Sequence, residues 1–224
     1  MLDRLVRVEA AGRALARGDA GPATLGYIFS AVPSGVLSRL LTQVRQAMPS
    51  VRLSLRQAET PEQIAAVAER RLDLALVRPR ATYPIGVNAV TVHSESLLLF
   101  LDRAHALAAL PAIPAEALAS QTFLLPQFNE RVGLLEKLDR LATLGGFALL
   151  EVIRTGDFVS AATMAAAGYG VVLAPASLIR LGIDTLVARP ITGFADKIET
   201  ALLWHEDGPP ISRRVAALLE PRAR

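Results

Sequence analysis

The 224-residue chain contains no cysteine. Disulfide bonds, thiol chemistry and zinc sites with cysteine ligands are therefore excluded, and the absence fits a reducing compartment. Histidine is scarce as well: His93, His105 and His205 are far apart in the sequence, and no pair has the spacing of metal ligands. We therefore expect no metal site and no cofactor, and we interpret the three histidines as surface or hinge residues.

Lysine is almost absent, since it occurs only at Lys137 and Lys197, and arginine carries the formal net charge of +3. Several arginines gather near the two termini, but they do not form the dense, interleaved basic patch that is typical of nucleic-acid binding. We interpret them as the solvated faces of terminal helices. This chain by itself is not expected to bind DNA.

A long uninterrupted hydrophobic run is also missing. Residues 160–179 carry no charge and formally reach the length of a membrane span. However, the segment is rich in alanine and is interrupted by Gly168, Gly170 and Pro175, so two soluble elements that meet at a glycine explain it better. The charged N-terminal stretch lacks the apolar block of a secretory signal. We expect no membrane partner and a cytoplasmic location.

What the chain does contain is a regular alternation of strand and helix patterns, because 52% of its residues are hydrophobic and their spacing changes from segment to segment. A helix with one apolar stripe is predicted over residues 2–17, and residues 18–22 form a glycine- and proline-containing linker. Strands are predicted over residues 23–30, 51–57, 72–77, 86–92, 95–101, 121–125, 149–153, 171–174 and 198–205. Helices are predicted over residues 34–48, 61–71, 130–144, 157–167 and 211–220.

This alternation predicts an α/β protein with parallel sheets. The pattern changes once, where the strand-like runs 86–92 and 95–101 follow each other without a helix between them. Two α/β units joined by two strand-like passages indicate two lobes with a double crossover.

The segment "AAAGYGVVLAP", residues 165–175, contains two glycines but does not fit a phosphate-binding loop. A dinucleotide fingerprint places its glycines after a strand and before a helix, whereas here the predicted helix comes first. We expect Gly168 to supply the left-handed residue that ends this helix, and Gly170 to let the chain turn into the next strand. The sequence also lacks a Walker motif, a G-x-S-x-G elbow and an H-E-x-x-H pair.

Polar side chains follow the predicted strands at the ends where open α/β sheets bind ligands. The candidate contacts are Ser30, Ser34, Thr60, Arg78, Gln127 and Thr155. Together with helix amino termini they favour a small carboxylate or sulfonate, and an arginine adds a bidentate contact to an anion. Each residue also has an ordinary alternative, namely a helix cap for the hydroxyl and amide residues and a surface salt bridge for Arg78. Catalysis has less support, because no histidine is evidently placed to activate Glu59, Asp157 or the serines.

Three segments carry a resemblance to a known family. The stretch from "VPSGVLSRLL" to "LDLALVRP" (residues 32–79), "LLLFLDRAHALA" (97–108) and "AAAGYGVVLAP" (165–175) resemble, in this order, the effector-binding domain of LysR-type transcriptional regulators. Ala106 stands where that family usually has a proline. The resemblance implies a two-lobed, periplasmic-binding-protein-like (type II) fold that binds a small inducer between its lobes and is not an enzyme. For the inducer, the resemblance to members with an arginine like Arg78 implies a small aromatic or aliphatic acid.

The resemblance also implies an organisation. Residues 1–20 would be the end of a linker helix, residues 21–93 with 196–224 lobe I, and residues 94–195 lobe II. The family reads DNA through a winged helix-turn-helix that is absent here, so we expect DNA binding only in a full-length parent protein.

The resemblance further implies a side-by-side homodimer, and a tetramer in the parent protein. The predicted helix 34–48 of one subunit would lie against helix 157–167 of another, near Arg39, Arg45 and the alanines of 161–167. Two alternatives stay open: a solute-binding protein, or an enzyme on the same two-lobe scaffold.

Overall fold

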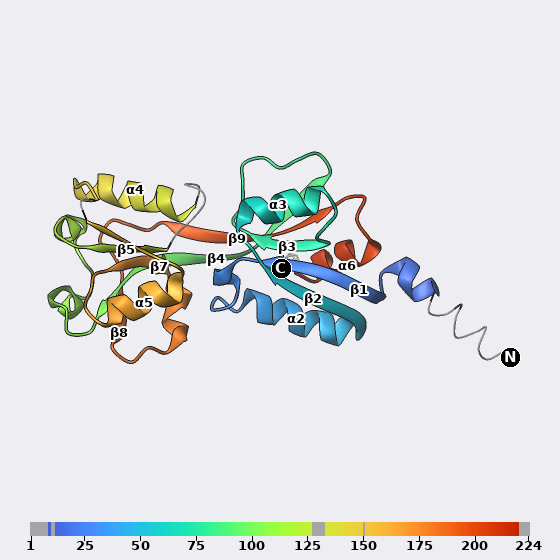
Figure 1. The fold of residues 1–224 in the computed structure, drawn as a ribbon, viewed down its shortest axis with the longest axis horizontal. Coiled ribbons are helices and arrows are strands. Elements are labelled where there is room, and N and C mark those ends of the chain that lie inside the picture. The colour runs from blue at the N-terminus through green and yellow to red at the C-terminus, as the bar shows by residue number, and fades with distance from the viewer. Residues whose placement is uncertain (1–8, 10–11, 127–132, 150, 220–224) are drawn as a thin grey trace. The chain divides into compact units, whose positions relative to one another are not determined.

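The computed structural model describes residue 9 and residues 12–126, 133–149 and 151–219. Their contacts divide the chain into two compact units (Figure 1). Unit 1 comprises the described residues up to His93 and from Glu199 onwards, and unit 2 comprises those within Ser94–Ile198. Two strands, β4 (Val87–Asp102) and β9 (Lys197–His205), have residues in both units.

Unit 1 is built on a sheet of three parallel strands, which β9 and then the first part of β4 continue. The parallel strands are β1 (Ala20–Tyr27), β2 (Ser50–Gln57) and β3 (Leu74–Val77), and β9 follows β3 in the order β2-β1-β3-β9. Leu25 in the middle strand pairs with Leu55 on one side and with Leu74 on the other. Because the three parallel strands point the same way, their carboxyl ends meet at one edge of the sheet.

The helices of unit 1 cover both faces of this sheet. They are α2 (Val36–Ala47), α3 (Thr60–Ala68) and α6 (Pro210–Leu219). Successive side chains of β3 alternate between the two faces of the sheet, as the period of a strand requires. Leu74 and Leu76 share one apolar cluster with residues of α2 and α6. Ala75 and Val77 pack against α3 on the other face (Figure 1). This two-sided burial explains why β3 is a continuous apolar run.

Unit 2 contains an antiparallel group and a parallel pair of strands. The far end of β4 pairs with β7 (Val172–Pro175) and with β8 (Leu186–Arg189). Strand β5 (Phe123–Pro126) is parallel to β6 (Val152–Thr155). The helices are α4 (Leu134–Gly145) and α5 (Phe158–Ala166), and four short 3-10 helices complete the described chain: η1 (Phe29–Ala31), η2 (Ala106–Ala109), η3 (Ala115–Leu118) and η4 (Ala176–Leu181).

The predicted elements are confirmed in type, with three corrections. The predicted strands 86–92 and 95–101 are one strand, β4, because the polar residues between them continue the extended backbone. The linker is shorter than predicted, because β1 begins at Ala20 and includes Pro22. Strand β3 pairs only with residues 25–27 of β1. On that side, Pro22 therefore has no neighbouring strand that would need its missing N–H as a donor. Strand β8 was not predicted.

At the N-terminus, the predicted helix over residues 2–17 is observed over residues 12–17, and its earlier part lies largely outside the described residues. In the part of the chain that the structure describes, no helix is long and apolar enough to cross a membrane.

The two glycines of residues 165–175 have the roles that their order in the sequence predicts. Gly168 follows α5 with a φ of 82°, the left-handed conformation that ends many helices. A Cβ atom on Gly170 would lie 2.3 Å from the carbonyl oxygen of Thr122, so only a glycine lets the strand approach this closely.

Candidate functional site

Three of the predicted site residues come together at the carboxyl edge of the sheet in unit 1. The ladder of hydrogen bonds continues past the strand ends, because Ile28 N–H donates to Leu76 O and Ala58 N–H donates to Tyr27 O. The segments that leave β1, β2 and β3 therefore run close together. They carry Ser30, Thr60 and Arg78.

Arg78 is the centre of this group. Its Nη2 donates to Ser30 Oγ at 2.5 Å, and its backbone N–H donates to Thr60 Oγ1 at 3.1 Å. The other guanidinium nitrogen, Nη1, donates to the carbonyl oxygen of Glu199 at 2.8 Å and contacts Thr200 Oγ1 at 3.4 Å. We call Arg78, Ser30, Thr60 and Thr200 the Arg78 cluster.

The hydroxyl groups of the Arg78 cluster are buried. Ser30 is 5% exposed, and Thr60 and Thr200 are each 1% exposed. Each hydroxyl oxygen accepts from Arg78, and none of the three donates its own proton to an acceptor among the described residues. A hydroxyl group is both donor and acceptor, so these three keep a proton to donate. A hydroxyl that already accepts from a cation is a stronger donor.

Thr60 differs from its predicted role as the cap of the helix. Helix α3 includes Thr60 as its first residue, and its N-cap is Glu59, which makes no side-chain capping hydrogen bond. The Thr60 hydroxyl points instead to the start of the segment after β3, where it accepts from Arg78 N–H. Nearby, the buried Gln63 donates through Nε2 to Ala58 O at 2.7 Å and so fixes the segment that leads into α3.

Ser34 lies next to this group in the sequence but serves the start of α2. Its Oγ accepts from Val36 N–H at 3.4 Å, and its backbone N–H donates to Ser30 O at 3.1 Å. The predicted helix 34–48 begins at Val36, and its N-cap is Gly35 with a φ of 79°. The left-handed glycine, rather than a serine, therefore leads the chain into this helix.

The remaining predicted residues belong to the other unit. Thr155 ends β6, is 5% exposed, and donates its hydroxyl to Asp157 O at 3.1 Å. Asp157 is the N-cap of α5, where its carboxylate accepts from Ser160 N–H at 2.7 Å. This hydrogen bond lowers the pKa of Asp157, so the group is ionised and is a weak base at neutral pH. Gln127 lies outside the described residues.

Glu199 and Thr200 were missed by the sequence reasoning. They lie in "KIETALLWH", where a single threonine in a strand is an ordinary β-branched residue. No local signal connects them to Arg78, which is more than 120 positions earlier in the chain. The contact exists because β9 pairs antiparallel with β3, with Ala201 opposite Val77.

His105 and His205 have structural partners. His105 Nδ1 accepts from Leu107 N–H, and its Nε2 lies 3.0 Å from Gln121 Oε1. His205 Nδ1 accepts from Asp207 N–H. Within the described ranges, no group of three or more histidine, aspartate or glutamate side chains could hold a metal ion.

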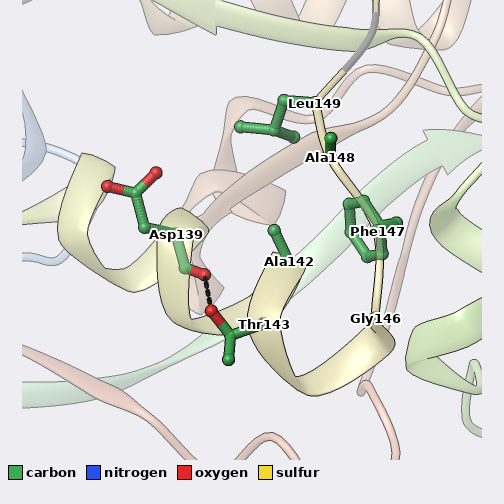
Figure 2. Close-up of a pocket in the computed structure, with 7 residues that line it drawn as sticks. All are labelled: Asp139, Ala142, Thr143, Gly146, Phe147, Ala148 and Leu149. Atoms are coloured by element: carbon green, nitrogen blue, oxygen red, sulfur yellow. Dashed lines mark hydrogen bonds between the residues drawn. The ribbon is translucent and has the colours of Figure 1, made fainter.

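A cavity of about 540 Å³ lies in unit 2 at the end of α4, and no predicted site residue is among its described lining residues (Figure 2). Its lining residues are Asp139, Ala142, Thr143, Gly146, Phe147, Ala148 and Leu149. Thr143 donates its hydroxyl to Asp139 O within the helix, and Phe147 stacks on Phe123 with ring centroids 6.0 Å apart. These contacts support the helix end and do not form an anion site.

Comparison with known proteins identifies the family of the chain. The model of the LysR substrate binding domain matches residues 16–223. The chain is 32% identical over 208 residues to the uncharacterized HTH-type transcriptional regulator YnfL of Escherichia coli K12, covering 90% of this chain and 69% of that protein. It covers 66%, 62% and 60% of three other regulators. The chain thus spans about two thirds of the length of the curated relatives that it matches.

Solved structures agree on the fold. The LysR family regulator CbnR has a TM-score of 0.83 at 21% identity, over 98% of this chain and 75% of that one. The effector-binding domain of BenM with its effector benzoate has a TM-score of 0.74 at 19% identity, and the match covers 90% of this chain and 96% of that one. The effector-binding domain of QuiR in complex with shikimate has a TM-score of 0.76 at 15% identity, and the match covers 89% of this chain and 95% of that one. The predicted two-lobed, periplasmic-binding-protein-like α/β fold is confirmed.

Proposed function

The chain belongs to the family of LysR substrate-binding domains, and from that premise we propose that it senses a small organic acid whose carboxylate binds at the Arg78 cluster. The observation that carries this proposal is the set of buried hydroxyls that accept from one arginine and keep their protons. Such a group is a poor site for a cation or an apolar ligand. It is well suited to a carboxylate, whose oxygens only accept hydrogen bonds.

The start of α3 supports the same ligand. The helix begins at Thr60 without a side-chain cap, so its amino end carries partial positive charge beside the hydroxyl groups. Together with the charge of Arg78, this end of the sheet favours an anion. Charge-assisted hydrogen bonds of this type are shorter and stronger than neutral ones.

The size of the acid is inferred from two relatives of the same fold. Their solved effector-binding domains contain benzoate and shikimate, each a single carboxylate on a six-membered ring. We propose a small cyclic acid for this chain, with a sulfonate as the second candidate headgroup. Thr155, Gln127 and Ser34 remain proposed further contacts.

We propose binding without catalysis. The relatives of the chain are transcriptional regulators. Asp157, one of the two carboxylates that an enzyme would have to use, is committed to capping α5 and is ionised. An acid–base enzyme needs a group whose pKa lies near the working pH. The pKa of Asp157 is instead lowered, further away from neutral pH.

The proposal extends to the whole regulator. Binding of the acid in the cytoplasm would alter DNA binding by a helix-turn-helix module in the parent protein, which would be a homodimer or a tetramer. Of the alanines near the proposed contact through α5, Ala162 is fully buried within unit 2, whereas Ala167 is exposed and Ala166 is half-buried. The exposed positions of this helix include Val159, Ser160 and Thr163. A Thr163→Arg variant that sediments as the wild-type dimer would contradict this interface.

The experiment that tests the ligand class is calorimetric titration with benzoate, shikimate, benzenesulfonate and the neutral analogue benzamide. We expect the acids to bind and benzamide not to bind. Arg78→Gln should weaken acid binding about ten- to a hundredfold, because hydrogen bonds to charged groups contribute about 1.5–3 kcal/mol. Arg71→Gln, which removes a surface ion pair with Glu69, is the matched control. Binding of benzamide as tightly as benzoate would overturn the proposal.

A further inference from the structure

Strand β9 passes from unit 2 into unit 1 between Ile198 and Glu199. Its ladder with β3 joins Ala201 to Val77 and continues away from this point. The residues between the ladder and the passage, Glu199 and Thr200, are contacted by the side chain of Arg78. On the side of β9 that faces β3, Arg78 thus adds contacts up to the residue at which the strand enters unit 1, while the other neighbour of β9 in the sheet is β4.

The same guanidinium group belongs to the proposed anion site. Nη2 donates to Ser30 Oγ, whose proton is left for a ligand, while Nη1 donates to Glu199 O. A carboxylate that accepts from Ser30 would therefore lie at one end of a continuous chain of hydrogen bonds. The chain runs from the ligand through the Ser30 hydroxyl and the guanidinium to the backbone of β9.

We propose that Arg78 is a positioning residue that couples occupation of the acid site to the anchoring of β9 at its entry into unit 1. This inference rests on the proposed function. The guanidinium is the donor in both bonds, so the coupling acts through its position: an acid bound to Ser30 fixes the partner of Nη2, and the planar guanidinium then keeps Nη1 in place at Glu199 O. Binding then rigidifies the start of β9, a segment that continues into the other unit.

The role of Arg78 in holding β9 is testable without a ligand. Hydrogen exchange of the amides of residues 199–201 should be about three- to tenfold faster in Arg78→Gln than in the wild-type chain, because a strand end that loses one or two hydrogen bonds frays more often. Arg71→Gln, at a surface position of the same unit, should leave these amides within about twofold of wild type. Unchanged exchange in Arg78→Gln would overturn the proposal whatever the ligand is.

A second arm tests the coupling with benzoate as the probe. At saturation we expect exchange at residues 199–201 to slow about three- to tenfold in the wild-type chain. In Thr200→Val, which keeps Ser30 and Thr60, the slowing should be smaller because one partner of Nη1 is lost. Benzoate that binds without slowing these amides overturns the coupling but leaves the proposed function standing. If no acid binds, the proposed function fails, and the ligand-free arm still decides whether Arg78 holds β9.

Discussion

Helices α3 and α5 begin in the same way in the sequence and differently in the structure. Each follows a parallel strand, and each has a threonine at its entry, Thr60 in unit 1 and Thr155 in unit 2. In unit 2 the Thr155 hydroxyl donates to Asp157 O, and the Asp157 carboxylate caps the helix, so both groups are used locally. In unit 1 α3 has no side-chain cap, and the Thr60 hydroxyl accepts from Arg78 and keeps its proton.

The difference shows what separates a cap from a binding group. The Asp157 carboxylate accepts a backbone N–H at the positive end of its helix, whereas α3 has Glu62 in its first turn but no side-chain cap. The Thr155 hydroxyl donates within the chain and has no proton left for a ligand. The proposed acid site therefore places most of its affinity in unit 1, although both helix entries carry a threonine and an acidic residue.

The largest effect is expected from removing the two threonine hydroxyls one at a time. Thr60→Val should weaken benzoate binding about tenfold or more, because a hydrogen bond to a charged group is lost. Thr155→Val, an equally conservative change at an equally buried position, should weaken it about threefold or less, since its hydroxyl serves Asp157. Both affinities are measured by calorimetry. Equal losses would show that the two units share the carboxylate and would break the comparison.

The second effect concerns stability in unit 2. Asp157→Ala should lower the free energy of unfolding by about 1 kcal/mol at neutral pH, the usual effect of losing an N-cap. Asp157→Asn keeps an acceptor oxygen and should cost less. Urea denaturation with an unchanged slope measures both.

The pH dependence of this effect follows from the direction of the shift. The Ser160 N–H bond lowers the pKa of Asp157 in the folded chain, so the charge stabilises the fold fully above the unfolded pKa of about 3.9. The contribution is lost as the pH falls through the lower, folded value. A difference between wild type and Asp157→Asn that grows on acidification would contradict this cause.

The contrast also marks what the sequence can and cannot predict. The alternation of apolar patterns is enough to place the strands and helices and to bring Ser30, Thr60 and Arg78 to one edge, because carboxyl ends of parallel strands always meet. It does not predict the direction of a hydroxyl proton, which depends on partners from other segments. Glu199 and Thr200 reach Arg78 only through the antiparallel pairing of β9 with β3. Strand β8 was missed for a similar reason, since four residues with little alternation become a strand only beside β4.

The smallest effect concerns the other ends of the same two helices. After α3, Arg70 has a φ of 58°, and its N–H donates to Val67 O; after α5, Gly168 has a φ of 82°, and its N–H donates to Ala165 O. The hydrogen bonding is the same, but only unit 2 uses the residue that adopts this conformation without strain. Arg70→Gly should raise the free energy of unfolding by about 0.5–1 kcal/mol, and Gly168→Ala should lower it by about 1 kcal/mol, since a left-handed conformation costs an L-residue about 1–2 kcal/mol.

Arg70→Ala separates the backbone from the side chain in this last prediction. It removes the guanidinium but keeps the Cβ atom, so its free energy of unfolding should stay close to that of the wild type. If Arg70→Ala stabilised the chain as much as Arg70→Gly, the gain would come from removing a charge from an arginine-rich surface and not from relieving the helix end. The strain at Arg70 lies at the opposite end of α3 from Thr60, so relieving it should leave benzoate affinity unchanged.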